Sequence, residues 1–176
     1  MHRGLVRTLI LLPGTVLVFI PAAILAITKD SHFSAKFAAP GQTLFWLALS
    51  SALSGLTLSI WALTLFLKVG QGTPAPWDPP KKLVVRGPYR YVRNPMITGA
   101  LLMLLAEAML LQSWPIAIWL VLFFIGNSVY FPLVEEKGLE KRFGNDYREY
   151  KANVPRWIPR LRAWNQWKDD LPMGDQ

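Results

Sequence analysis

The stretch from Asn94 to Val134 decides the fold of this chain: NPMITGALLMLLAEAMLLQSWPIAIWLVLFFIGNSVYFPLV. It contains 41 residues and only one charged side chain, that of Glu107. An α-helix needs about 20 apolar residues to cross the hydrocarbon core of a bilayer, which is ~30 Å thick. The stretch is therefore long enough for two membrane-spanning helices, and the polar, proline-containing sequence Gln112-Ser113-Trp114-Pro115 predicts the turn between them.

Two more apolar runs precede this stretch, over residues 8–28 and 43–67, and neither carries a formal charge. The first run is longer than the roughly 7–15 apolar residues of a signal peptide, which favours a helix that is retained in the membrane. We therefore expect an all-α, polytopic membrane protein that forms a single domain over residues 1–176. Its four transmembrane helices are predicted at about 8–28, 43–67, 96–112 and 115–133. The third helix is short, so the backbone groups of the turn after it need hydrogen-bond partners.

The charge distribution agrees with a membrane protein. Only 17% of the residues are charged, against roughly 25% in an average soluble domain. If both termini face the cytoplasm, all of the 19 Lys and Arg residues except Lys29 and Lys36 lie on the cytoplasmic side. The net charge of +8 therefore follows membrane topology and does not predict a nucleic-acid partner. We expect a multi-pass protein of a bacterial inner membrane with both termini in the cytoplasm.

Two cytoplasmic segments could carry chemistry. The loop at 68–95 is rich in proline, which stiffens it, and it contains Trp77, Tyr89 and Tyr91. Such a long loop is uncommon unless it is functional or disordered, although a rigid interfacial linker is the alternative. The absence of cysteine excludes thiol nucleophiles and thiolate metal sites, and two histidines are too few to predict a metal centre.

The second segment, at 135–152, reads EEKGLEKRFGNDYREYKA. Apolar side chains recur on one helical face, at Leu139, Phe143, Tyr147 and Tyr150. This spacing predicts an amphipathic helix that lies along the cytoplasmic membrane surface. We expect the remaining residues, 153–176, to form an interfacial tail.

Three acidic residues stand out from this pattern. Glu135 and Glu136 lie where the fourth helix leaves the membrane, so they are either solvated or placed to receive a cationic ligand. Glu107 is predicted near the middle of the bilayer, ~16 Å from Met96 along the helix. There it is either functional or neutral and hydrogen-bonded, with Asn127 or Gln112 as possible partners.

The two cytoplasmic segments together resemble a known superfamily. GPYRYVRNPMITG, from Gly87 to Gly99, is similar to the Arg-His-Pro-x-Tyr-x-Gly loop of the isoprenylcysteine carboxyl methyltransferase and phospholipid methyltransferase superfamily. EEKGLEKRFGNDYREYKANVPRWIP, from Glu135 to Pro159, resembles its second block: an acid pair, Phe-Gly, Tyr-x-x-Tyr and Val-Pro. The order and spacing of the two blocks are more specific than either block alone.

The resemblance implies a membrane methyltransferase that uses S-adenosylmethionine, without a metal, on a lipophilic acceptor. It places a set of residues at the cofactor: Gln71, Lys82, Leu83, Val84, Tyr89, Asn94, Pro95, Met96, Ile97, Glu135 and Glu136. Carboxylates and aromatic rings suit the cationic sulfonium and ammonium groups of this cofactor. Glu136 and Glu107 are candidate catalytic bases, and Arg156 is a further catalytic candidate.

The chain departs from the superfamily pattern at four positions. Asn94 replaces the motif histidine and Ile97 replaces a tyrosine, while Phe131 and Asn153 replace arginines. Without those arginines a prenylcysteine carboxylate lacks its expected cationic clamp. The acceptor therefore stays open between such a carboxylate, a phospholipid amine and a small apolar thiol. The alternative is a non-enzymatic accessory protein on the same scaffold.

Overall fold

A computed structural model of the chain describes residues 10–72 and 80–165, and it describes no side chains for residues 10–12. All regular elements in these ranges are helices, as predicted. The membrane-side elements are the π-wound helix η1 (Ile10–Phe19), α2 (Ile20–Thr28), α3 (Thr43–Leu65), the π-turn η2 (Phe66–Gly70), α4 (Pro95–Leu110) and α5 (Trp114–Tyr130). The remaining elements are the 3₁₀ turn η3 (Gly87–Arg90), the π-turn η4 (Phe131–Glu135) and α6 (Glu136–Asn153).

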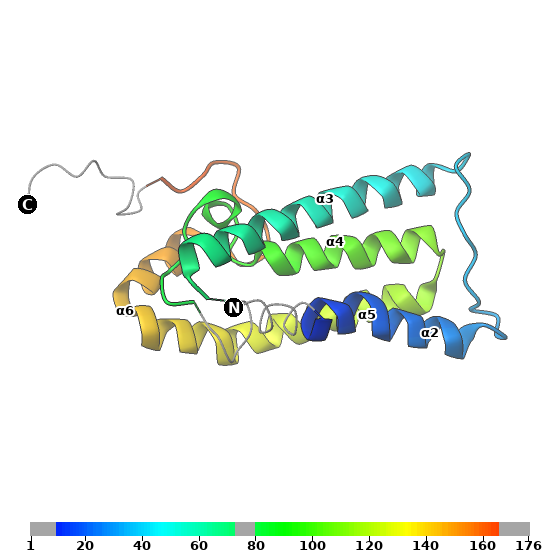
Figure 1. The fold of residues 1–176 in the computed structure, drawn as a ribbon, viewed down its shortest axis with the longest axis horizontal. Helices are drawn as coiled ribbons and strands as arrows, with labels where there is room; N and C mark the ends of the chain where they lie inside the picture. The colour runs from blue at the N-terminus through cyan, green and yellow to red at the C-terminus, as the bar shows by residue number, and fades with distance from the viewer. Residues whose placement is uncertain (1–9, 73–79, 166–176) are drawn as a thin grey trace, which may run out of the picture.

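The helices run side by side along the long axis of the molecule (Figure 1). Two of them are long and apolar enough to cross a membrane, over Thr43–Gly70 and Trp114–Asn153. Two shorter apolar helices, Pro13–Thr28 and Pro95–Leu110, accompany them. All four predicted apolar helices are therefore present within a few residues of their expected bounds, except that the predicted start of the first at residue 8 lies outside the described residues. The count of four spans stays a prediction.

The outer faces of these helices are apolar and uncovered. In α3, Leu53 is 57% exposed and Ile60 is 55% exposed, and in α5 Leu122 is 56% exposed. A soluble protein rarely leaves so continuous an apolar surface in water. In a bilayer the same surface faces lipid tails, and the helices satisfy their own backbone hydrogen bonds.

Helices α3 and α4 are packed closely through glycine. A Cβ atom added to Gly55 would lie 2.6 Å from the carbonyl oxygen of Gly99, and one added to Gly99 would lie 2.7 Å from the carbonyl oxygen of Gly55. Ser51 also donates a hydrogen bond across the interface to the carbonyl oxygen of Leu102, at 2.8 Å. Small residues let membrane helices approach in this way, so the two backbones fix each other's position.

The turn after α4 finds its hydrogen-bond partners inside the protein. It falls at the predicted break, where Gln112 adopts a left-handed conformation with φ of 43°. The linker between α2 and α3 crosses this end of the bundle, and the amides of Lys36 and Ala38 donate to the carbonyl oxygens of Leu111 and Leu110, at 3.0 and 2.8 Å. The short third helix is thus completed by another part of the chain.

Helix α6 continues directly from α5 and η4, and its backbone breaks at Gly144, where φ is 55°. Its predicted apolar face is confirmed, but the surface that this face covers differs from our expectation. Tyr147 and Tyr150 are buried in a cluster with Val85, Val154 and Trp164, and Leu139 and Phe143 pack against that cluster. The face therefore packs on the protein's own loop and tail, and is not free to lie on the bilayer.

Candidate functional site

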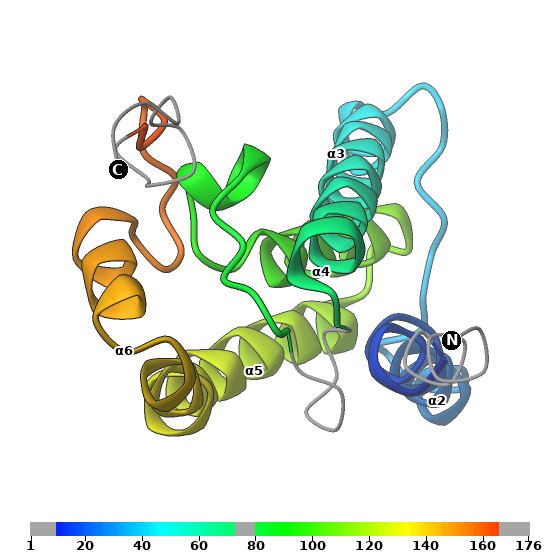
Figure 2. The ribbon, with the colours of Figure 1, turned by 60° about the vertical axis from the view of Figure 1, so that its left-hand side comes forward.

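The described part of the loop after α3, residues 80–93, lies between α3 and α6 (Figure 2). Its extended residues alternate in direction, as in any extended chain. Val84 packs with Ala62 of α3 and with Tyr89, whereas Val85 packs into the cluster of Tyr147 and Tyr150. Because Val84 and Val85 point to opposite sides, the loop packs against both α3 and α6.

Tyr89 is at the centre of this arrangement. Its side chain is 7% exposed, and its ring lies 6.3 Å from that of Phe66. The hydroxyl of Tyr150 donates a hydrogen bond to the carbonyl oxygen of Tyr89, at 2.8 Å, and so joins the two sequence blocks. Burial, with a smaller contribution from the Glu135 carboxylate, raises the pKa of Tyr89 well above its usual range. Its hydroxyl therefore stays protonated at neutral pH.

Glu136 holds a second junction between the blocks. Its Oε1 atom lies 3.0 Å from Nη1 of Arg93 and 2.7 Å from Nε of Arg156, and its Oε2 atom lies 3.2 Å from Nζ of Lys151. Arg93 comes from the loop, Lys151 from α6 and Arg156 from the tail. One carboxylate, 2% exposed, therefore ties three segments together.

This environment keeps Glu136 ionised. Burial by itself would raise the pKa, but the hydrogen bond from Arg156, together with Arg93 and Lys151, holds the pKa of Glu136 below its usual range. Its charge is already matched by cations of the protein. A carboxylate in this state is a poor proton acceptor.

The neighbouring carboxylate is in a different state. Glu135 is half-buried, and burial raises its pKa, with a smaller rise from Glu136 opposed by the charge of Arg142. It is close enough to Tyr89 to raise the pKa of that hydroxyl. The two adjacent acids therefore differ: Glu136 is paired with three cations, whereas Glu135 has no ion pair with any residue that the structure describes.

Asn94 directly precedes α4, and its side chain has a hydrogen-bond donor without a partner among the described residues. Its backbone carbonyl accepts bonds from both the amide and the hydroxyl of Thr98, each at 3.0 Å. Its side-chain Nδ2 atom is buried and has no hydrogen-bond partner in the described part of the chain. A buried donor without a partner is costly, so the position fits one that a ligand satisfies.

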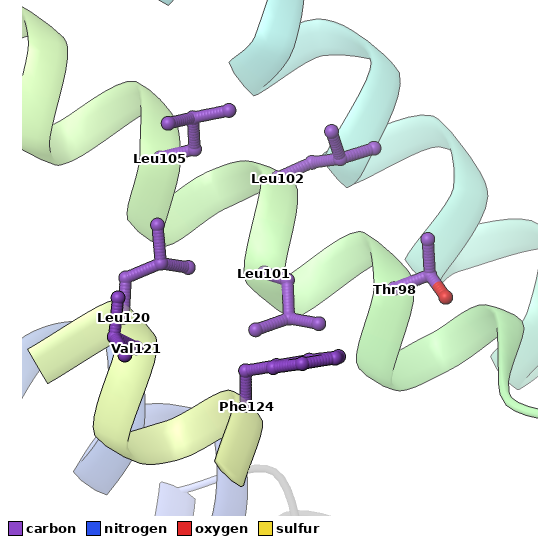
Figure 3. A pocket seen from close by; sticks show the side chains of 7 residues that line it. All are labelled: Thr98, Leu101, Leu102, Leu105, Leu120, Val121 and Phe124. Atoms are coloured by element: carbon purple, nitrogen blue, oxygen red, sulfur yellow. The ribbon is translucent and has the colours of Figure 1, made fainter. Parts of the chain in front are cut away.

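An apolar groove of about 350 Å³ runs between α4 and α5 and begins one helical turn from Asn94 (Figure 3). Across it, the side chains of Leu101 and Phe124 point toward each other. Its seven lining residues include a single polar one: Thr98, Leu101, Leu102, Leu105, Leu120, Val121 and Phe124. The groove can hold an alkyl chain but offers almost nothing to a polar group.

The other predicted site residues differ in burial. Leu83 packs against the cluster around Tyr150, and Met96 packs against Val84 and Tyr89. Pro95 is buried, Ile97 and Arg156 are half-buried, and Gln71 and Lys82 are exposed at the edge of the loop. The cofactor candidates therefore gather at one end of α4.

Glu107 does not belong to this group. It lies one turn before the end of α4, far along the helix from Asn94. The expected partners were wrong, because Asn127 donates to the carbonyl oxygen of Phe123 and Gln112 donates to Gln42. The structure thus separates this acid from the Glu135–Glu136 pair.

The sequence interpretation missed Arg93 and Lys151 as partners of Glu136. Arg93 directly precedes the Asn-Pro motif, and Lys151 directly follows the Tyr-x-x-Tyr motif. This placement beside both motifs was a usable signal for a buried acid between them. The groove had no comparable signal, since any apolar helix pair has the same composition.

Comparison with known proteins identifies the scaffold. The family model described as phospholipid methyltransferase matches residues 43–146, which is more than half of the chain. No curated protein and no solved structure gave a significant match. The matched range covers α3, the loop after it, the helices α4 and α5 that line the groove, and both Glu135 and Glu136. The chain belongs to the phospholipid methyltransferase family, a member of the isoprenylcysteine and phospholipid methyltransferase superfamily.

Proposed function

We propose that this protein is an S-adenosylmethionine-dependent membrane methyltransferase that acts on a lipophilic acceptor. The observation that carries the proposal is that residues suited to a cationic ligand lie at one end of an apolar groove. Glu135, Tyr89 and the free donor of Asn94 belong to the end of the bundle where the groove begins. A methyltransferase for lipids needs both features together, because its donor is polar and charged while its acceptor is apolar.

The residues present fit the cofactor. Glu135 offers a carboxylate that has no matching cation at hydrogen-bond distance among the described residues, and the buried Nδ2 of Asn94 offers a donor. Val84 and Met96 supply an apolar wall beside Tyr89. When bound, S-adenosylmethionine supplies an electrophilic methyl group on a sulfonium sulfur. The protein then contributes mainly by positioning and by excluding water.

The groove would hold the apolar chain of the acceptor, and the reacting head group would lie near Thr98. Arg93 and Arg156 both bond to Glu136, and Phe131 stands where carboxyl-methylating relatives have an arginine. A carboxylate acceptor would therefore have to compete with Glu136 for Arg93 and Arg156. This competition favours a phospholipid amine over a prenylcysteine carboxylate as the acceptor.

Cofactor binding is best tested by calorimetric titration of S-adenosylhomocysteine into the purified protein in nanodiscs. We expect Glu135→Gln to weaken binding at least tenfold, which corresponds to about 1.4 kcal/mol. Glu149→Gln is the matched control, because it removes the same charge from an exposed position of α6 and should bind like the wild type. Equal binding by both variants would place the cofactor elsewhere.

Catalysis is tested separately, by transfer of labelled methyl groups into a lipid extract followed by mass spectrometry of the product. A labelled amine-containing phospholipid is the expected result. Binding of S-adenosylhomocysteine with no transfer to any lipid would favour the accessory-protein alternative. Transfer to a fatty carboxylate would instead correct the assignment of the acceptor.

A further inference from the structure

The segment from Pro155 to Trp164, here called the tail loop, follows α6 and lies outside the range that matches the family. It is held at both ends by tryptophan. The ring of Trp157 lies 5.3 Å from that of Phe124 and 5.9 Å from that of Phe131. Trp164 is 4% exposed and stacks on Tyr150, with ring centroids 6.1 Å apart. The tail loop is therefore a fixed part of the fold (Figure 1, orange to red).

Backbone hydrogen bonds join the tail loop to the loop that carries the candidate site. The amide of Arg93 donates to the carbonyl oxygen of Pro155, at 2.9 Å. The amides of Arg160 and Trp164 donate to the carbonyl oxygens of Tyr91 and Arg90, at 3.0 and 3.1 Å. These bonds hold the tail loop against residues 90–93.

Between its anchors the tail loop presents apolar side chains outward. Ile158 is 80% exposed and Leu161 is 101% exposed. Two cationic side chains, Arg160 and Arg162, alternate with them in the sequence Ile-Pro-Arg-Leu-Arg. Apolar residues interleaved with arginine are typical of segments that lie at the surface of an anionic membrane.

The depth of Trp157 places this surface at the membrane. Its two partners are on the same helix as Val134, the last apolar residue before the acid pair. At a rise of 1.5 Å per residue, Phe131 lies about 5 Å and Phe124 about 15 Å inward of Val134. The ring that contacts both is therefore on the membrane side of Val134.

We propose that the tail loop inserts Ile158 and Leu161 into the bilayer leaflet on the α6 side, with Arg162 on anionic head groups. The occupant of this surface is the lipid of the protein's own membrane. The inference does not depend on methyl transfer, because it rests on the exposure and depth of the tail loop alone.

The absence of cysteine makes a direct test possible. Leu161→Cys, labelled with an environment-sensitive NBD fluorophore, is reconstituted in vesicles of phosphatidylcholine with phosphatidylglycerol. The control is Lys141→Cys, on an exposed position of α6 that lies about 10 Å beyond Val134 along the helix axis. We expect blue-shifted emission at position 161 and quenching by lipids spin-labelled near the head group, and neither effect at position 141.

Two further results decide the proposal. Emission at position 161 that matches position 141 in the same vesicles overturns it, as does a blue shift that depends on protein concentration and resists the lipid quenchers, since that indicates a second copy. Adding Arg162→Gln to Leu161→Cys should reduce the extra quenching seen when anionic lipid replaces part of the neutral lipid. A quenching that ignores lipid charge in both proteins contradicts the assigned role of Arg162. A thermal unfolding midpoint equal to that of the wild type confirms that each variant is folded.

Discussion

The two faces of α4 are built in opposite ways. Toward α3, Gly55 and Gly99 bring the backbones into contact, and Ser51 bonds across the interface. Toward α5, larger side chains stand apart and leave an apolar groove of about 350 Å³. One face therefore fixes the helix, and the other leaves room for the apolar chain that we propose as the acceptor. Because α4 is fixed by α3, its other face can keep the same shape while an alkyl chain binds and dissociates.

The largest effect is expected where the fixed face is disrupted. Gly99→Val would bring a side chain against the backbone of α3, since even a Cβ atom there would lie 3.1 Å from the amide nitrogen of Ser59. We expect a loss of about 3 kcal/mol or more in the free energy of unfolding, because overpacking displaces both backbones. Thermal unfolding in detergent measures this loss.

Gly126→Val on α5 is the matched control, because an added Cβ atom meets nothing within 4 Å there. It should leave the unfolding midpoint nearly unchanged. If both substitutions cost the same, the contrast between the two faces of α4 is wrong.

A smaller loss of stability is expected where the fixed structure continues into the site. Glu136→Gln removes the negative charge from a junction of three cations, and the side chain of Arg93 is only 10% exposed. An uncompensated buried charge costs several kcal/mol, and partial exposure of the other cations reduces this to about 2 kcal/mol. The measurement is again thermal unfolding, with Glu149→Gln as the variant that should behave like the wild type.

The pH dependence of unfolding provides a separate check of this junction. The pKa of Glu136 is lowered in the folded protein from an ordinary value of 4.5. Its stabilising contribution is therefore complete above that value and is lost as the pH falls toward the folded pKa. The wild type should lose this component on acidification below pH 4.5, and Glu136→Gln should lack it. If the free energy of unfolding depends on pH in the same way in the two proteins, the Glu136 carboxylate does not form the stabilising ion pairs.

The smallest effect is expected on the face of α4 that lines the groove, where a substitution should change activity and not stability. Leu101→Trp places a large ring where the side chains of Leu101 and Phe124 already face each other (Figure 3). We expect about a tenfold lower kcat/KM for a lipid acceptor, equivalent to about 1.4 kcal/mol. Leu122→Trp makes the same change at a position of α5 outside the groove lining. Binding of S-adenosylhomocysteine should be unchanged in both, and equal activity in both would remove the groove from the acceptor path.

Much of the fold could be predicted because apolar length is a local property. The break at Gln112 to Pro115 and the inward face of Leu139, Phe143, Tyr147 and Tyr150 both follow from short-range spacing. The surface covered by that face could not be predicted, since an amphipathic helix fits either a bilayer or its own protein. Val85 and Trp164 decide between them here, from distant parts of the sequence.

The candidate site was predictable only as a set of residues. The motifs indicated Tyr89, Asn94 and the acid pair, but adjacent glutamates look identical in a sequence. What separates them is the partners of Glu136, since Arg93 and Arg156 are brought to it only by tertiary folding. The direction in which each carboxylate faces is therefore a property of the fold and not of the motif.

The tail loop also sets the order in which the protein can mature. Arg93 leaves the ribosome well before Arg156, the partner that meets it at Glu136. At about 5 to 20 residues per second this interval is roughly 3 to 13 s. During that time the membrane helices up to α5 can insert and pair, while the loop between α3 and α4 lacks its final contacts. The complete Glu136 junction can therefore form only late in biosynthesis, after the last turn of α6 and the tail loop have emerged.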